Sequence, residues 1–189
     1  MHFIKIRGVQ VIAGLLICLS SGHLSAAIAQ YQTEEERLFK AAFIYNFAKF
    51  TSWPKSYQNK NNKLTLCTLG KNELTNDLKR LGGKTVKGRQ VVIKEIEKKY
   101  PVENCQMLYI ANVGKNNYIN VIKKLKHKPV LTISDLNGFA KKGGVIQFYR
   151  KQGKTRLIIN LNVARQAGLK ISSRLLILAN VINSRQEVK

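Results

Sequence analysis

The sequence predicts an α/β domain built as a three-layer sandwich, in which helices cover both faces of a mainly parallel sheet and an antiparallel hairpin lies at one edge. Between residues 64 and 133, short apolar runs typical of strands alternate with runs of helical spacing. After Ser134 this alternation stops, and Gln152-Gly153-Lys154 joins two strand-like runs as a hairpin turn would. The chain of 189 residues is long enough to bury one ordinary core.

The first predicted helix covers residues 33–50. Thr33 and Glu36 form a capping box at its start, and Trp53-Pro54 follows its end. Its apolar residues occupy most of the helix circumference, so we expect it to be buried on more than one side. The domain itself covers one side, and a second subunit covering another would make the protein a homodimer.

The central elements follow from apolar periodicity. The predicted strands are residues 64–69, 91–93, 107–111 and 130–133, and the helices between them are 73–81 and 117–125. Such an order implies a parallel sheet with helices on both faces. In the last third we expect a hairpin of 145–149 with 156–161, a short helix over 162–166, and a final helix from Ser172 or Ser173 through Ile182.

Residues 1–29 have the pattern of a cleavable secretory signal peptide. Lys5 and Arg7 form a positive start, an uncharged apolar run covers 9–19, and Ala27-Ile28-Ala29 offers a small-x-small cleavage site. An apolar run of this length is too short for a membrane anchor, because a spanning helix needs about 20 apolar residues. We therefore expect a periplasmic protein, one domain over residues 30–189, with no stable membrane insertion after cleavage.

The chain is strongly basic, with 33 Lys and Arg against 10 Asp and Glu. Such a charge attracts anionic partners, and export argues against nucleic acid as that partner. Lipid head groups, lipopolysaccharide, cell-wall polymers and acidic protein surfaces stay open. Because the cations are scattered along the chain, an ordinary solvated lysine surface is an equal alternative.

Groups for catalysis or metal binding are scarce. After leader removal His127 is the single histidine, and Asp135 is the single acidic residue between 104 and 186. These residues supply no nucleophilic triad and no metal-ligand cluster, so we expect a non-enzymatic binding protein without metal or cofactor. A weak enzyme using Asp135, Lys170 and Ser172 is the minor alternative. The candidate ligand or partner contacts are Tyr45, Phe50, Trp53, Asp135, Asn160, Lys170 and Ser172.

Cleavage after Ala29 also removes Cys18 and leaves Cys67 and Cys105. In an oxidising compartment such a pair favours a disulfide, although two separate buried thiols stay an alternative. If 64–69 and 107–111 are adjacent parallel strands, Cys67 lies late in its strand and Cys105 precedes the other. A bridge then requires a stagger that brings the Cα atoms within about 7 Å.

Several segments, in order, resemble the YfiR family of periplasmic regulators. The resemblance covers nearly the whole chain after the leader. The matching segments are 40–50 with Trp53-Pro54, 66–70, 105–109, 129–135 with 138–140, Gly143-Gly144, 159–161 with Ala164, 167–172, and Leu175-Leu176.

This resemblance implies a dimeric periplasmic protein with a Rossmann-like fold. In that family the best-known arrangement is repression of an inner-membrane diguanylate cyclase through its periplasmic sensory domain. An outer-membrane lipoprotein sequesters the repressor, and release raises cyclic di-GMP and promotes biofilm formation. Cys67 and Cys105 match the family's structural bridge, whereas a second cysteine pair has no counterpart here. The alternative function is a periplasmic small-molecule sensor or an accessory protein for a histidine kinase or a transporter.

Overall fold

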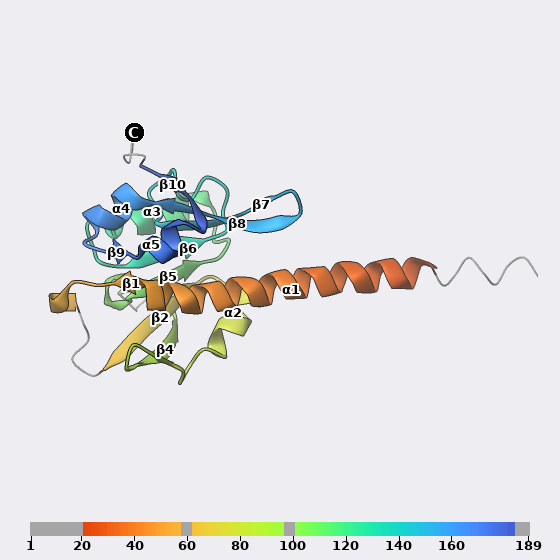
Figure 1. Cartoon of the computed structure of the whole chain (residues 1–189), viewed down its shortest axis with the longest axis horizontal. Coiled ribbons are helices and arrows are strands. Elements are labelled where there is room, and N and C mark those ends of the chain that lie inside the picture. The colour runs from red at the N-terminus through yellow and green to blue at the C-terminus, as the bar shows by residue number, and fades with distance from the viewer. Residues whose placement is uncertain (1–20, 58–61, 97–100, 184–189) are drawn as a thin grey trace, which may run out of the picture. The chain divides into compact units, whose positions relative to one another are not determined.

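The structure, a computed structural model, describes residues 21–57, 62–96 and 101–183, with side chains described from Thr33 onward (Figure 1). The chain divides into two units, Met1–Glu36 and Arg37–Lys189. The described part of the first unit is helical and belongs to α1 (Ser21–Phe50). The predicted signal peptide falls largely on residues 1–20, outside the described residues, and stays a prediction. No helix among the described residues is long and apolar enough to cross a membrane.

Helix α1 begins at Ser21, so the predicted helix start at Thr33 is wrong for the chain as described. Residues 24–32 include three Ala and two Gln, which favour helices, and no proline interrupts them. The predicted end is confirmed, because α1 stops at Phe50 ahead of Trp53-Pro54.

Among the described residues of the second unit, eight strands form a mixed sheet in the order β10-β8-β7-β6-β5-β2-β4-β3. The strands are β2 (Lys63–Leu69), β3 (Thr85–Val86), β4 (Arg89–Glu95), β5 (Met107–Ile110), β6 (Leu131–Ser134), β7 (Ile146–Lys151), β8 (Lys154–Asn160) and β10 (Ala179–Ile182). The pairs β7–β8 and β3–β4 are antiparallel, and the other pairs are parallel. A separate antiparallel pair joins β1 (Thr51–Ser52) to β9 (Lys170–Ile171). The predicted α/β class, the mainly parallel sheet and the antiparallel pair are confirmed.

The remaining elements are short. The helices are α2 (Glu73–Lys79), α3 (Lys115–Lys124), α4 (Leu161–Gln166) and α5 (Ser173–Leu176), with 3-10 turns η1 (Lys55–Tyr57) and η2 (Val102–Asn104). The predicted final helix through Ile182 is wrong: α5 ends at Leu176, and β10 follows it. This strand forms because the free edge of β8 supplies backbone partners, with Val181 opposite Ile159.

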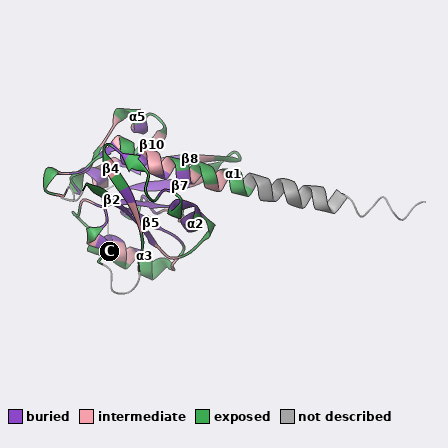
Figure 2. Ribbon diagram, turned by 90° about the horizontal axis from the view of Figure 1, so that it is seen from below, coloured by how far each residue is buried: buried purple, intermediate pink, exposed green. Residues whose placement is uncertain are grey.

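Two hydrophobic clusters pack on the sheet, which places helices against both faces. The larger cluster holds side chains of α1 and α2, and Ile44, Leu66 and Leu78 are buried in it. The ring centroids of Phe47 and Phe148 lie 5.8 Å apart there. The smaller cluster holds α3, where Tyr118 and Ile122 are buried. Figure 2 shows the strands between them largely in the buried colour. Alternate residues of each central strand therefore serve two cores.

The structure contains a disulfide between Cys67 and Cys105, with their Cα atoms 5.9 Å apart. In the register of the sheet Cys67 lies opposite Leu108, so the expected stagger is real. The disulfide forms despite this stagger because Cys105 lies outside β5, at the end of the 3-10 turn η2. Both cysteines are fully buried in the smaller cluster.

The order of strands reverses between β2 and β5. From β2 the chain passes through α2 to β4 on one side, and then returns to β5 on the other side of β2. In open α/β sheets this reversal leaves a crevice at the carboxyl ends of the two strands, where ligands commonly bind. The polar residues at these ends are therefore the first place to look for a site.

Candidate functional site

Four polar side chains meet at the carboxyl ends of β2, β5 and β6. The Tyr109 hydroxyl lies 3.5 Å from Asp135 Oδ1 and accepts a hydrogen bond from Asn72 Nδ2 at 3.1 Å. Lys40 of α1 lies 3.3 Å from Asp135 Oδ2. We call Lys40, Asn72, Tyr109 and Asp135 the carboxyl-end cluster. It combines residues that are far apart in the sequence, and Asp135 is its one predicted member.

Burial, with a further contribution from the Asp135 charge, raises the pKa of the Tyr109 hydroxyl far above its usual value. The tyrosine therefore stays protonated at neutral pH and donates to the Asp135 carboxylate. A neutral phenol, an amide and a paired carboxylate make a fixed hydrogen-bonded network that ties α1 to the sheet.

Two of the predicted contact residues are structural. Trp53 is 7% exposed, and its ring nitrogen donates to the carbonyl of Gln106 at 3.0 Å. Asn160 is 1% exposed; its side chain donates to the Ala140 carbonyl at 2.9 Å and caps α4 by accepting from the Val163 amide. Their side chains are thus used within the protein.

Phe50 and Ser172 meet beside the β1–β9 pair, because the Ser172 amide donates to the Phe50 carbonyl at 2.9 Å. The Ser172 hydroxyl caps α5. Lys170 is exposed and pairs with Ser52 in that small sheet. Tyr45 lies on α1, and its hydroxyl donates to the Thr85 carbonyl at 2.9 Å. The seven predicted residues therefore do not converge on one site, and their contact roles stay proposals.

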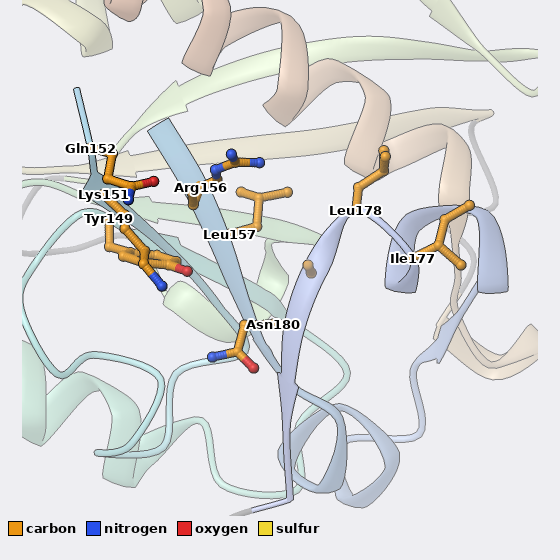
Figure 3. Close-up of a pocket in the computed structure, with 9 residues that line it drawn as sticks. Tyr149, Lys151, Gln152, Arg156, Leu157, Ile177, Leu178 and Asn180 are labelled. Carbon is orange, nitrogen blue, oxygen red and sulfur yellow. The ribbon is translucent and has the colours of Figure 1, made fainter. Parts of the chain in front are cut away.

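A cavity of about 310 Å³ lies elsewhere, where the β7–β8 hairpin meets β10. Figure 3 shows Tyr149, Lys151 and Gln152 at one end of this hollow and Ile177 and Leu178 at the other. Ile177 is 81% exposed and Leu178 is 57% exposed. Arg156 adds a second cation to the lining. We call the cavity together with Ile177, Leu178 and Val181 the β10 surface.

The β10 surface could not be predicted from the sequence, because Leu178, Ala179 and Ile182 fit the apolar spacing of a helix that continues from Leu175 and Leu176. The exposure of the apolar side chains in this surface follows from the end of α5 at Leu176. Large exposed apolar side chains beside polar groups are typical of a protein-binding surface. The residues that line the cavity include no carboxylate, histidine or cysteine.

Within the described residues no group of three or more His, Cys, Asp and Glu side chains is placed to hold a metal ion. The side chains at both candidate sites offer hydrogen bonds, charge and apolar contact.

A model of a domain family described as YfiR/HmsC-like matches residues 38–180 of the chain. The match spans α1 from Leu38 and the sheet strands from β2 to β8, and it ends within β10. No curated protein matches the chain.

Proposed function

We propose that this chain, which belongs to the YfiR/HmsC-like family, is a periplasmic regulator that represses an inner-membrane diguanylate cyclase by binding its periplasmic sensory domain. Repression lowers cyclic di-GMP and biofilm formation, and an outer-membrane lipoprotein that sequesters the regulator relieves it. The family match carries this proposal. The buried disulfide supports a location in an oxidising compartment.

The β10 surface supports binding as the mode of action. Strand β10 pairs with β8 along one side, and no described strand pairs with its other side. An edge of this kind accepts an extended segment of a partner, and Ile177 and Leu178 offer apolar anchors beside it. Covering each of these side chains contributes at most about 1.5–3 kcal/mol. Lys151 and Arg156 favour a partner segment that carries acidic residues.

The exposed apolar residues of α1 support a homodimer. Leu38 is 43% exposed and Phe39 is 42% exposed, although both lie in a helix whose opposite side is buried. A second copy covering them would remove this apolar area from water. Light scattering of the purified protein tests the proposed homodimer. We expect a dimer for the wild-type protein and a monomer for the double variant Leu38→Gln with Phe39→Gln.

A deletion strain tests the function. We expect higher cyclic di-GMP without the gene, restored by the wild-type chain and not by a chain carrying Ile177→Glu and Leu178→Glu. The exposed Asn76→Glu variant on α2 adds a negative charge away from the β10 surface and should restore repression.

Unchanged cyclic di-GMP in the deletion strain, together with no cyclase recovered by crosslinking from membranes, would contradict repression. Full repression by the double variant would instead exclude the β10 surface as the contact. Substrate turnover by the purified protein would contradict the non-enzymatic role.

A further inference from the structure

A second, smaller cavity of about 150 Å³ lies between the end of α1, β1, the start of β2 and the β3–β4 hairpin. It is distinct from the carboxyl-end cluster and from the β10 surface, and it shares no residue with either. Two cations line it, Lys87 and Arg89, and no acidic residue does. We call it the Lys87–Arg89 pocket.

Both cations are held by backbone carbonyl groups. The Lys87 ammonium donates to the Thr51 carbonyl at 3.1 Å, and Arg89 donates to the Lys63 carbonyl through Nη2 at 2.6 Å and Nε at 3.2 Å. Neither cation forms an ion pair within the described part of the chain. Burial lowers the pKa of the Arg89 guanidinium, which nonetheless stays charged at neutral pH. The pocket thus holds two positive charges that no local carboxylate neutralises.

The Lys87 backbone is held in an uncommon conformation. Lys87 and Gly88 form the two-residue turn between β3 and β4, with φ angles of 50° and 75°. A side-chain-bearing residue in this left-handed region is unusual, and asparagine, aspartate or glycine is preferred there. The turn fixes where the lysine side chain leaves the hairpin, directly beside β1.

The other lining residues are apolar apart from Thr51 and Ser52. Trp53, Leu64 and Val86 line the pocket and are 7%, 2% and 1% exposed. Thr51 also lines it, and its buried hydroxyl has no hydrogen-bond partner among the described residues. A buried hydroxyl without a partner costs about 1–3 kcal/mol, which a bound polar atom would offset.

We propose that the Lys87–Arg89 pocket binds a small aliphatic monocarboxylate. The carboxylate pairs with Lys87 and Arg89 beside Thr51, and a short apolar chain lies against Trp53, Leu64 and Val86. The volume equals that of about five waters, which fits an acid of a few carbons. A phosphate dianion fits less well, because the apolar walls offer little to offset its larger desolvation cost. This site does not depend on the proposed regulation of a cyclase.

Isothermal titration calorimetry of the purified protein with acetate, propionate, butyrate, hexanoate and inorganic phosphate tests the proposal. We expect propionate and butyrate to bind in the millimolar range, and hexanoate and phosphate to bind at least about tenfold more weakly, a difference of about 1.4 kcal/mol. Propionamide, which is neutral and of similar shape, should give no binding heat.

Lys87→Gln should weaken butyrate binding at least about tenfold, consistent with loss of a charge-assisted hydrogen bond. Thr51→Val, which keeps the side-chain shape, should weaken it less. Lys84→Gln is the matched control, because Lys84 is an exposed lysine directly before β3 that does not line the pocket. Thermal melting of each variant establishes that it is folded.

Absence of binding heat with every carboxylate would overturn the proposal. So would tighter binding of phosphate than of butyrate, or equal losses in Lys87→Gln and Lys84→Gln, because the attraction would then come from the net charge of the protein.

Discussion

The hydroxyl of Tyr109 lies 3.5 Å from the carboxylate of Asp135, although Tyr109 belongs to β5 and Asp135 follows β6. The parallel arrangement of β5 and β6 places their carboxyl ends side by side, with Ile110 opposite Ser134. Tyr109 is fully buried, so its hydroxyl reaches the polar edge of the sheet from within the core. Two properties of this contact are measurable, its contribution to stability and the protonation of the phenol.

Tyr109→Phe removes the hydroxyl and keeps the ring. Asn72 and Asp135 are partly exposed and regain water, so we expect the free energy of unfolding to fall by only about 1 kcal/mol at neutral pH. Urea denaturation measures this change. A loss of the size caused by a core cavity would show that the ring itself had moved.

The same variant tests the protonation of Tyr109. In the unfolded chain a tyrosine loses its proton near pH of about 10, whereas burial and Asp135 keep Tyr109 protonated to higher pH in the folded protein. Above about pH 10 the unfolded state therefore binds fewer protons than the folded state, so the free energy of unfolding falls as pH rises. We expect a smaller fall in Tyr109→Phe between about pH 8 and about pH 11. Equal slopes for both proteins would contradict a phenol kept protonated by its surroundings.

Arg37→Met should destabilise the protein through Asp77. Arg37 Nε donates to the carboxylate of Asp77, whose side chain is 6% exposed on α2. Without Arg37, the ion-pair partner left to this carboxylate within the described part of the chain is Arg80, at 4.0 Å. Since removing one partner of a buried pair leaves an uncompensated charge, we expect a loss of about 2–4 kcal/mol, read from urea denaturation.

The control for Arg37→Met is Lys79→Met. It breaks the 2.7 Å contact with Glu95, in which both side chains are exposed. Because water and salt screen such a pair, we expect no measurable change in stability. Similar losses in the two variants would mean that the Arg37 effect comes from helix propensity or packing.

The elements predicted from sequence are those in which each segment carries its own signal. The predicted strands 64–69 and 130–133 and the predicted helices 73–81 and 117–125 each show an apolar period in the sequence, and they are confirmed as β2, β6, α2 and α3. Strand β10 lacked such a signal. Its residues have the spacing of a helix, and only the edge of β8, about twenty residues away in sequence, makes them a strand.

The sites depended still more on long-range contacts. Asp135 was recognisable as a lone acid after a strand, but its neighbour Lys40 lies far away on α1. Trp53 and Asn160 were predicted as ligand or partner contacts, and their side chains donate to the distant carbonyls of Gln106 and Ala140. A single sequence holds no signal for such pairings, so neither cavity was predictable from it.

Replacing the disulfide by Cys67→Ala with Cys105→Ala should lower the free energy of unfolding. The bridge spans a sequence separation of 38, and closing such a loop stabilises by about 4 kcal/mol in the chain-entropy model. We expect a loss of about 2–4 kcal/mol and a lower Tm. Adding a reductant should destabilise the wild-type protein and leave the double variant unchanged. A reductant effect on the double variant would show that the reductant acts elsewhere.

Gly144→Ala should disrupt the smaller core through Phe139. A Cβ at position 144 would lie 2.0–2.6 Å from three atoms of the Phe139 ring, which is fully buried and packs 6.1 Å from the Tyr118 ring. The ring must move away from its position, and we expect a loss of about 1–3 kcal/mol or more, as for other overpacked cores. Gly82→Ala is the milder comparison, because its Cβ would approach the Lys79 carbonyl at 3.2 Å without meeting a buried ring.

A double variant separates this steric cause from a backbone effect. Phe139→Leu shortens the side chain that meets the new methyl group, so Gly144→Ala should cost less in the Phe139→Leu protein than in the wild type. Urea denaturation of the four proteins gives the coupling between the two positions. Additive losses would show that Gly144 is needed for its own backbone rather than for the space it leaves to Phe139.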